Sequence, residues 1–391
     1  MPRCIARSLA AALLLGAALS AGPVFAAGAA DLPTAAPEQQ GVDTGRLIGL
    51  SEWIRARNLD VHSLLVVKDD KIVFERYSDG LTRDHNYELY SITKGVTALA
   101  AGLLIQDGRI ALSDKVAPIL AKQRPDLAAD FADKQDIELR HILTMSSGLL
   151  YNFKPKNDPI YYEEPDRLKL AARTQPKIPP GTEFEYTDIN PILTAAVLSA
   201  AAGMPIERYA EEKLFTPLGM KNAVWDRADK KGLVSAGWGL RLRPVDMAKI
   251  GLLVLHDGQY DGKQIAPATW IRQMTSPGVV PYFGDYWWIN DIVESEPEFD
   301  TMGFKGQFIV VLPKRNAVVV MTGLLSIQGG LRDADNVKIM RQIMKDHVLP
   351  ALDGGPAAPG STEALRTELR LAAQSKPAPG TEADPTDTPR R

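Results

Sequence analysis

The hydrophobic residues of this chain follow two periodicities, one typical of strands and one typical of helices. Residues 63–67 and 71–77 are rich in β-branched and aromatic residues on either side of Asp69-Asp70, a pattern that predicts a hairpin. Further along, apolar residues recur at helical spacing between positions 96 and 104. A helix that begins at Ser91 and ends at Asp107-Gly108 would therefore bury one face.

From about position 110 to 235 the pattern predicts helices and loops, punctuated by prolines. Residues 190–202 are apolar nearly all round, which is typical of a buried helix. β character returns near the end of the chain, and strands at both ends with helices between them favour an α+β fold. The other elements expected are helices over 137–145, 244–255, 268–274 and 334–347 and strands over 286–289, 308–312 and 317–322.

The first residues have the composition of a secretory signal. Arg3 and Arg7 precede an apolar run at 10–18, and Val24-Phe25-Ala26 has the small-x-Ala form of a cleavage site. Residues 1–26 are therefore predicted to be a signal peptide; the run is short for a membrane span, and a retained anchor is the alternative. The expected location is periplasmic or secreted, with no membrane contact after cleavage.

The last part of the chain differs in composition from its centre. Residues 354–391 are rich in Pro, Ala, Gly and Thr. Residues 363–373 could form a short helix, but their flanks cannot bury a core. We therefore predict a disordered tail.

Composition and charge exclude several classes of function. Hydrophobic content of 45% and charged content of 24% are ordinary for a globular protein, and a net charge of −3 gives no sign of a nucleic-acid partner. The only cysteine, Cys4, lies in the predicted signal peptide, so neither a disulfide nor thiol chemistry is expected afterwards. The five histidines lack a metal-ligand spacing, and no metal or organic cofactor is expected.

The predicted helix at Ser91 begins with Ser91-Ile92-Thr93-Lys94. Residues three apart on a helix share a face, so the Lys94 amine can reach the Ser91 hydroxyl. If burial keeps that amine neutral, it can accept the hydroxyl proton and make the oxygen a nucleophile. S-x-x-K is a motif of penicillin-binding proteins and serine β-lactamases. Chance also supplies so short a match, so the surrounding sequence must decide.

Five blocks of sequence in a characteristic order supply that context: YSITKGV (90–96), LIQDGRI (104–110), ILTMSSG (142–148), PGTEFEY (180–186) and LFTPLGM (214–220). Together they resemble the serine β-lactamase-like superfamily, in particular its branch of class C β-lactamases, certain esterases and 6-aminohexanoate-dimer hydrolases. The resemblance extends from about Gln39 to Pro350.

The resemblance implies a β-lactamase/penicillin-binding-protein-like fold, an antiparallel sheet flanked by helices plus an inserted helical domain. One hydrolase domain is then expected over residues 35–350. Its α/β part would comprise about 40–110 and 236–350, and the helical insertion about 111–235.

The second motif of this branch is Tyr-x-Asn, and Tyr186-Thr187-Asp188 stands in its place. A tyrosine beside lysine cations can relay protons to a leaving group, so Tyr186 is a candidate catalytic residue with Ser91 and Lys94; a packing aromatic is the alternative. Asp188 departs from the pattern. It could hydrogen-bond Lys94, hold that lysine as a cation and oppose a neutral base, or serve as a turn or N-cap residue.

The third motif, Lys-Thr-Gly in β-lactamases, departs furthest. The best placement puts Thr301-Met302-Gly303 there, as in the Gly-x-x-Gly-Gln segment of 6-aminohexanoate-dimer hydrolases that would include Gln307. The backbone N–H of Phe304 would then join that of Ser91 as an oxyanion hole. A shifted register would use Lys305-Gly306. In the preferred register the motif lysine is missing, which weakens antibiotic hydrolysis as the role.

The predicted activity is a serine hydrolase that cleaves a small ester or amide through an acyl-enzyme on Ser91. A D-alanyl carboxypeptidase or weak β-lactamase is the alternative, and a non-catalytic module that binds cell-wall peptides is the alternative of another class. The sequence predicts no oligomeric state. Softer candidates for substrate contact or support are Asp188, Gly303, Gln307 and aromatic residues that core packing explains equally well, namely Tyr151, Tyr161, Tyr162 and Tyr286-Trp287-Trp288.

Overall fold

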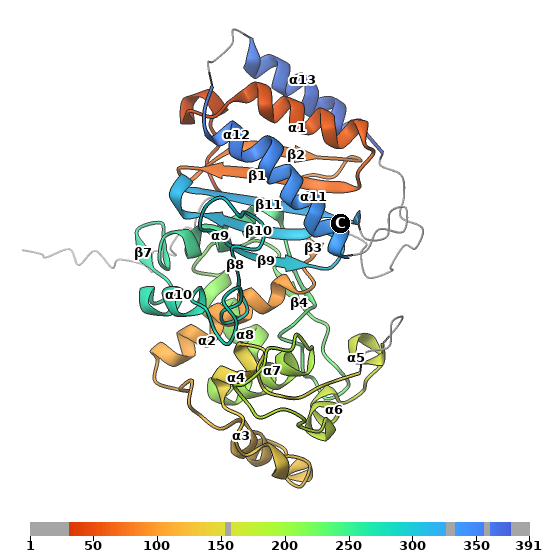
Figure 1. Ribbon diagram of the computed structural model, residues 1–391, viewed down its shortest axis with the longest axis vertical. Coiled ribbons are helices and arrows are strands. Elements are labelled where there is room, and N and C mark those ends of the chain that lie inside the picture. The colour runs from red at the N-terminus through yellow and green to blue at the C-terminus, as the bar shows by residue number, and fades with distance from the viewer. Residues whose placement is uncertain (1–30, 153–157, 326–332, 356–359, 377–391) are drawn as a thin grey trace, which may run out of the picture.

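A six-stranded antiparallel sheet forms the centre of the upper part of the molecule (Figure 1). The computed structural model describes residues 31–152, 158–325, 333–355 and 360–376, so the predicted signal peptide, residues 1–26, lies outside the described residues. The strand order is β2-β1-β11-β10-β9-β8, which joins strands from both ends of the chain. The strands are β1 (Val61–Lys68), β2 (Lys71–Tyr77), β8 (Trp288–Ile289), β9 (Phe299–Gly303), β10 (Gln307–Leu312) and β11 (Ala317–Gly323).

Both faces of this sheet are covered. Successive side chains on a strand point to opposite faces, so Val318 and Val320 of β11 enter one core while Val319 and Met321 enter the other. Helix α9 (Pro244–Leu255) packs on the first face, and α1 (Thr44–Ala56), α11 (Asp333–Ile343) and α12 (Leu349–Leu352) lie over the second. A sheet buried on both faces explains why its strands are apolar throughout instead of alternating.

The predicted β1–β2 hairpin is confirmed. Lys68 pairs with Lys71, which leaves a two-residue loop of Asp69 and Asp70. Both loop residues have left-handed backbone, with φ of 50° and 61°. Two such residues match the right-handed twist of the strands, and aspartate tolerates this conformation better than most residues.

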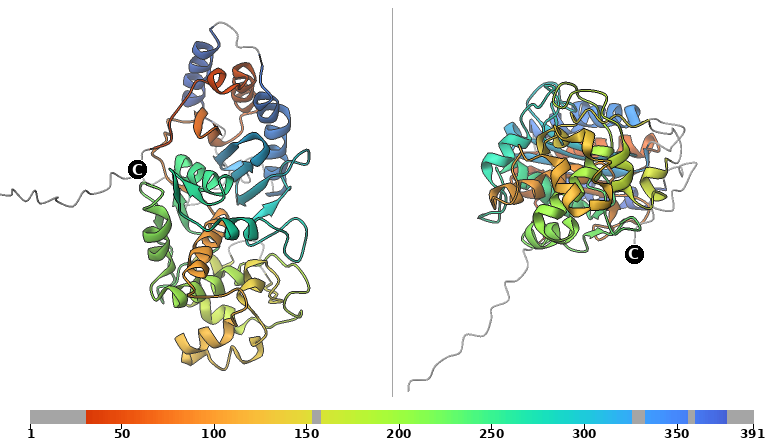
Figure 2. Two further views of the ribbon diagram at one scale, coloured as in Figure 1. Left: turned by 90° about the vertical axis from the view of Figure 1, so that its left-hand side faces the viewer. Right: turned by 90° about the horizontal axis from the view of Figure 1, so that it is seen from below.

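A helical part lies beneath the sheet, separated from it by α2 (Ile92–Gln106), whose residues Ile92–Leu104 are all buried. The side view in Figure 2 places α1 at one end of the molecule and the yellow helical segment at the other. A small sheet of order β3-β5-β4 joins the two parts. The elements of this region are α3 (Val116–Gln123), α4 (Leu139–Leu143), α5 (Pro159–Tyr162), α6 (Arg167–Arg173), α7 (Ile189–Ala202), α8 (Ile206–Ala210), β3 (Tyr87–Glu88), β4 (Val224–Trp225), β5 (Leu240–Leu242) and, nearer the main sheet, β6 (Gln259–Tyr260), β7 (Lys263–Gln264) and α10 (Ala268–Met274).

Helix α7 is buried along most of its length, as its apolar sequence predicts. Among the described residues, no single helix is both long and apolar enough to cross a membrane. Ile189–Ala202 and Ile206–Phe215 meet that test only as a pair, with a bend of 67° between them.

The prediction of a disordered tail over 354–391 is wrong for Ser361–Gln374. These residues form α13, which packs along α1. The buried Glu368 carboxylate accepts hydrogen bonds from Ser51 Oγ at 2.9 Å and from Arg55 Nη2 at 2.8 Å. The helix is thus ordered by partners more than 300 positions away, which the local composition does not reveal. Residues 356–359 and 377–391 lie outside the described residues.

Candidate active site

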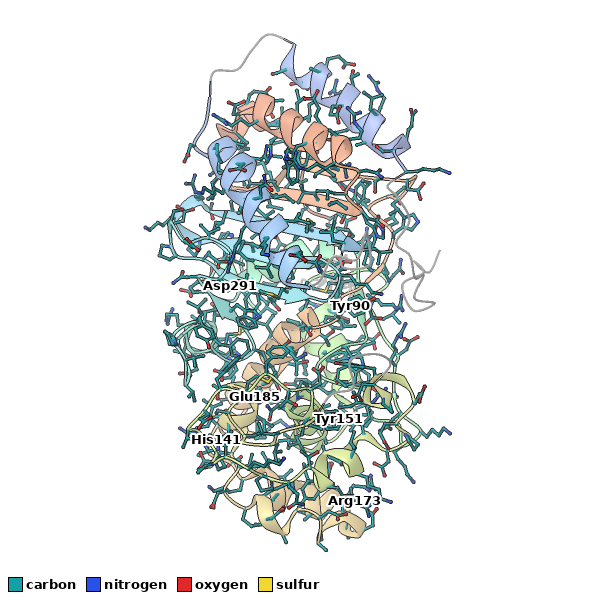
Figure 3. The ribbon with its side chains drawn as sticks, turned by 45° about the vertical axis from the view of Figure 1, so that its right-hand side comes forward. Tyr90, His141, Tyr151, Arg173, Glu185 and Asp291 are labelled. Carbon is teal, nitrogen blue, oxygen red and sulfur yellow. The ribbon has the colours of Figure 1, made fainter. Side chains whose placement is uncertain are left out.

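Ser91 lies at the N-terminal end of α2, where the chain turns sharply from β3 into the helix. Tyr90 has a left-handed backbone with φ of 48°, and Figure 3 places it at the junction of the sheet and the helical part. The first turn is tight, because the Lys94 N–H bonds to the Ser91 carbonyl at 3.0 Å. A bulky residue in left-handed conformation is typical of functional sites that the surrounding fold holds in place.

The predicted contact between the motif residues is present. Lys94 Nζ donates to Ser91 Oγ at 2.9 Å and to the Gly237 carbonyl at 3.2 Å. Its third neighbour is Asp188, with Nζ 2.7 Å from Oδ1. The ammonium also lies 4.9 Å from the centre of the Tyr186 ring. The structure therefore brings all three predicted catalytic residues together with Asp188 around one buried nitrogen.

The surroundings of Lys94 bear on its charge state, which the sequence left open. Burial alone would lower the pKa of Lys94, since the side chain is only 2% exposed. The carboxylate of Asp188 and the hydroxyl of Tyr186 outweigh burial, and the pKa of Lys94 rises above its ordinary value. This direction favours a cationic amine, the alternative in which Asp188 opposes a neutral base.

Asp188 holds that cation in place. It precedes α7 at the N-cap position, but its side chain makes no capping hydrogen bond. Instead Oδ1 pairs with Lys94, while Oδ2 accepts a hydrogen bond from the Tyr161 hydroxyl at 2.8 Å. Tyr161 comes from α5, and its ring lies edge-on to Trp238 at 5.0 Å. Of the alternatives for Asp188, the geometry favours an ion pair with Lys94.

The end of β9 lies directly against the chain before Ser91. A Cβ atom on Gly303 would come 2.2 Å from the Leu89 carbonyl oxygen, so only glycine permits this approach. Thr301, two residues earlier on the same face, packs against Gly95 of α2. This contact favours the register with Thr301-Met302-Gly303 at the third motif over the one with Lys305-Gly306.

Phe304, whose N–H is the predicted oxyanion donor, lies in the turn after Gly303. Within the described ranges, no hydrogen bond is formed by the backbone N–H of Phe304 or of Ser91. Gln307 is buried and fixes the turn, since its Nε2 donates to the Phe304 carbonyl at 3.2 Å and to the Gly323 carbonyl at 2.7 Å. Gln307 therefore supports the turn from behind.

The aromatic residues named as candidates for substrate contact differ in burial and in position. Trp287 is fully buried, and its Nε1 donates to the Gly95 carbonyl at 3.2 Å, so a substrate contact there is wrong and core packing is right. Its neighbour Trp288 is half-buried and stacks on Tyr186 at 5.9 Å. The Tyr151 hydroxyl donates to Asp158 Oδ1 at 2.9 Å. The strand expected over 286–289 is only Trp288–Ile289, and the chain enters it through Tyr286 in left-handed conformation, so the sequence pattern does not reveal which tryptophan is buried.

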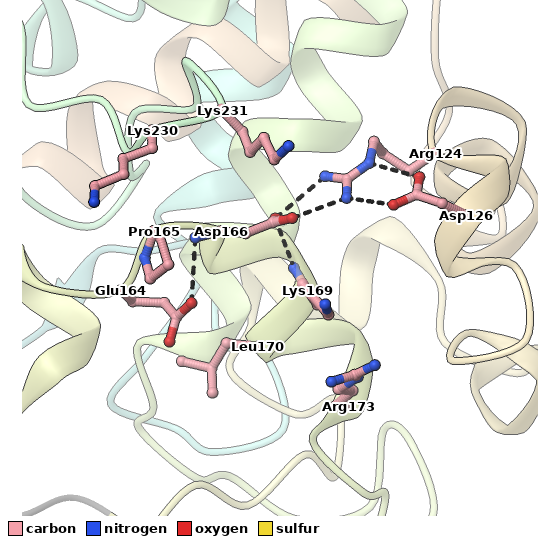
Figure 4. A pocket seen from close by; sticks show the side chains of 10 residues that line it. All are labelled: Arg124, Asp126, Glu164, Pro165, Asp166, Lys169, Leu170, Arg173, Lys230 and Lys231. Carbon is pink, nitrogen blue, oxygen red and sulfur yellow. Dashed lines mark hydrogen bonds and ion pairs between the residues drawn. The ribbon is translucent and has the colours of Figure 1, made fainter.

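A separate pocket of about 670 Å³ lies in the helical part (Figure 4). Arg124 bridges Asp126 and Asp166 there at 2.7 and 2.9 Å, and none of the residues around Ser91 lines it. Within residues 31–152, 158–325, 333–355 and 360–376, no group of three or more His, Cys, Asp or Glu side chains is arranged to hold a metal ion.

Comparisons with known proteins place this chain in a family. Residues 37–358 match the family model described as Beta-lactamase. An Escherichia coli (strain K12) protein described as "Putative D-alanyl-D-alanine carboxypeptidase" is 22% identical over 368 residues, covering 74% of this chain and 85% of that protein. A Salmonella paratyphi A protein of the same description is 28% identical over 244 residues, and this match spans just over half of each chain, 56%.

Solved structures share the fold. The "Putative 6-aminohexanoate-dimer hydrolase from Bacillus anthracis" superposes with a TM-score of 0.65 at 21% identity, covering 82% of this chain and 88% of that one. "EstCE1, a hydrolase with promiscuous acyltransferase activity" superposes with a TM-score of 0.59 at 18% identity, covering 77% of this chain and 99% of that one. The predicted α+β architecture is thereby confirmed. Because the family model spans most of the sequence, this chain belongs to the Beta-lactamase family.

Proposed function

We propose that this chain is a serine hydrolase that cleaves an ester or a small amide through an acyl-enzyme on Ser91. The observation that carries the proposal is the 2.9 Å contact from Lys94 Nζ to Ser91 Oγ inside a buried cluster with Tyr186 and Asp188. A structural lysine in a core would be a costly substitute for an apolar residue, whereas a reactive serine requires such a neighbour.

The charge of Lys94 suggests how the proton moves. Ser91 Oγ forms a bond to the substrate carbonyl carbon while the Lys94 cation, through its hydrogen bond, stabilises the charge that develops on that oxygen. Tyr186 relays the proton: its oxygen accepts the Ser91 proton while its own hydroxyl proton passes to the departing alcohol or amine. The Ser91 and Phe304 N–H groups receive the negative charge of the carbonyl oxygen. Water then attacks the acyl-enzyme, releases the acid and returns the proton to Ser91.

The substrate class rests on the relatives. One structural neighbour is named a hydrolase with promiscuous acyltransferase activity and another a 6-aminohexanoate-dimer hydrolase. Lys305, the lysine nearest the third motif, is 2% exposed, with its ammonium 5.3 Å from the Tyr90 ring centre. It is thus poorly placed to bind a substrate carboxylate. This favours neutral esters and amides over β-lactam antibiotics.

A panel of p-nitrophenyl esters and p-nitroanilides, run on the wild type and on Ser91→Ala, tests the proposal. The wild type should hydrolyse short-chain esters or anilides, and Ser91→Ala should lose at least a thousandfold in kcat/KM. Ser375→Ala, a serine at the end of α13, is the matched control and should retain the wild-type rate. Full activity in Ser91→Ala would show that the proposed nucleophile is wrong.

A D-alanyl carboxypeptidase is the second candidate, favoured by the description of the Escherichia coli relative. Penicillin separates the alternatives. A stable adduct on Ser91 supports the peptidase, rapid turnover supports a β-lactamase, and ester cleavage without an adduct supports the esterase or amidase. A chain that shows none of these activities would favour a non-catalytic module that binds cell-wall peptides.

A further inference from the structure

Three near-parallel rings lead outward from the candidate catalytic tyrosine. The Trp288 ring centre lies 5.9 Å from that of Tyr186 with 20° between the planes, and the Tyr282 ring lies 6.4 Å from Trp288 at 10°. Phe283 supports them from below, edge-on to Trp288 at 4.8 Å. We call Tyr186, Trp288 and Tyr282 the aromatic shelf. It starts at the buried Lys94 cluster and ends on the surface.

Exposed apolar side chains lie on the loop that forms the outer end of this shelf. In the described part of the chain, the large hydrophobic residues with substantial exposure are Val279, Tyr282, Phe304 and Leu371. Tyr282 ends the shelf, Val279 lies three residues before it, and Phe304 belongs to the turn of the predicted oxyanion hole. Single exposed hydrophobic residues are common, but two on one loop, at the end of a stacked row that reaches the candidate catalytic tyrosine, are typical of a ligand site.

The loop that carries the shelf is held in shape before any ligand arrives. The Gly278 N–H bonds to the Phe283 carbonyl at 2.8 Å, and the Ile289 N–H bonds to the Tyr282 carbonyl at 3.0 Å. Phe184, two residues before Tyr186, lies edge-on to Tyr282, with the ring centres 5.8 Å apart. A pre-formed aromatic surface binds a planar group with little loss of conformational entropy.

The charges beside the shelf disfavour an anionic ligand. Its two segments, residues 183–186 and 279–289, contain three carboxyl groups, Glu183, Glu185 and Asp285, and neither Lys nor Arg. Glu183 and Glu185 are exposed next to the rings, whereas Asp285 is buried. These carboxylates disfavour an anionic ligand, and the Lys94 cation 4.9 Å from the Tyr186 ring centre disfavours a cationic one at the inner end, which leaves a neutral ring.

We propose that the aromatic shelf binds a neutral aromatic ring in the leaving group of the substrate. The inference rests on the proposed function, in which Tyr186 delivers the proton to the departing oxygen or nitrogen. Because the shelf is continuous with the Tyr186 ring, a group stacked on Trp288 and Tyr282 lies on the side from which that proton comes. Tyr282 and Trp288 then select the leaving group.

Two pairs of esters test this assignment. Benzyl acetate and butyl acetate differ in the leaving alcohol, while ethyl phenylacetate and ethyl butanoate differ in the acyl group. In the wild type, kcat/KM for benzyl acetate should exceed that for butyl acetate. Tyr282→Ala should reduce this ratio about three- to tenfold, the range expected from the loss of one aromatic contact. Tyr282→Phe keeps the ring and should keep the ratio, as should Trp53→Leu on the remote helix α1.

Several outcomes would overturn the inference. An unchanged benzyl-to-butyl ratio in Tyr282→Ala, with butyl acetate still cleaved in a Ser91-dependent way, contradicts the shelf and leaves the proposed function intact. A loss confined to the phenylacetate pair contradicts the leaving-group side. Equilibrium binding of benzyl acetate to Ser91→Ala, followed by tryptophan fluorescence, needs no turnover: it should weaken when Tyr282→Ala is added, and no weakening refutes the proposal.

Discussion

Asp188→Asn should separate a lysine that works as a cation from one that works as a neutral base. In the wild type, Asp188 Oδ1 lies 2.7 Å from Lys94 Nζ, and the Asp188 carboxylate is the strongest influence that raises the pKa of Lys94 against burial. The asparagine keeps the shape and an acceptor oxygen but removes the charge. Burial then dominates, and the pKa of Lys94 falls.

The effect on stability follows from the same contact. Coulomb's law at 2.7 Å and an effective dielectric constant of about 20 gives about 6 kcal/mol of gross attraction, much of which offsets the desolvation of the two charges. Removal of one partner from a buried ion pair costs about 3–5 kcal/mol. We expect the lower end, about 3 kcal/mol less free energy of unfolding at pH 7, because the amide oxygen still accepts a hydrogen bond and Lys94 can lose its proton.

The assay is the pH profile of kcat/KM for an activated ester. If Lys94 acts as a cation, activity is lost as pH rises through the pKa of Lys94, so the alkaline limb moves to lower pH in Asp188→Asn. Tyr161→Phe is the matched control: it removes only the 2.8 Å hydrogen bond to Oδ2, so the limb should move much less. An Asp188→Asn variant that is more active at pH 7, with its acidic limb moved to lower pH, would refute the reasoning and restore a neutral base.

Three further predictions concern residues that support the site and the fold. Gly303→Ala places a methyl group against the Leu89 carbonyl and should lower kcat about 100-fold, because it displaces the turn that carries Phe304. Gly49→Ala, which has open space around it, is the control and should keep the wild-type kcat. Equal rates for the two variants would contradict the proposed role of this turn. Burial raises the pKa of Asp285 to about 7, so the carboxyl stays protonated in the folded chain while the unfolded chain ionises, and stability falls as pH rises from about 4 to 7. Asp285→Asn should remove that decline. Measured by urea unfolding, the free energy of unfolding of the variant relative to the wild type should be about 2–4 kcal/mol more favourable at pH 8 than at pH 4. An unchanged pH dependence would show that this carboxyl is not the cause. Glu368→Ala should lower the free energy of unfolding by about 2–3 kcal/mol, because the buried Arg76 and the half-exposed Arg55 lose their nearby carboxylate. If the loss is no larger than that caused by Glu363→Ala, an exposed position on the same helix, α13 contributes little to stability.

Local patterns in the sequence predicted the elements whose cause is local. The β1–β2 hairpin is specified by two aspartates that adopt left-handed backbone, and the helix Pro244–Leu255 by its apolar length and its first proline. The contact between Ser91 and Lys94 follows from helix geometry alone. These predictions needed no knowledge of the rest of the chain.

Features set by distant residues were left open or not predicted. The sequence left open whether Asp188, 94 positions later, holds Lys94 as a cation, and it did not distinguish Trp288, which stacks on Tyr186, from the buried Trp287. Order in Ser361–Gln374 depends on Ser51 and Arg55 at the other end of the chain. In each case the deciding contact joins segments that the sequence alone does not bring together.

Detection of the acyl-enzyme tests the central claim most directly. Rapid quenching of the wild type with p-nitrophenyl acetate, followed by peptide mass spectrometry, should show one acetyl group per chain, on Ser91, and a matching burst of p-nitrophenol. An acetyl group on another residue, or an undiminished burst from Ser91→Ala, would contradict an acyl-enzyme on Ser91.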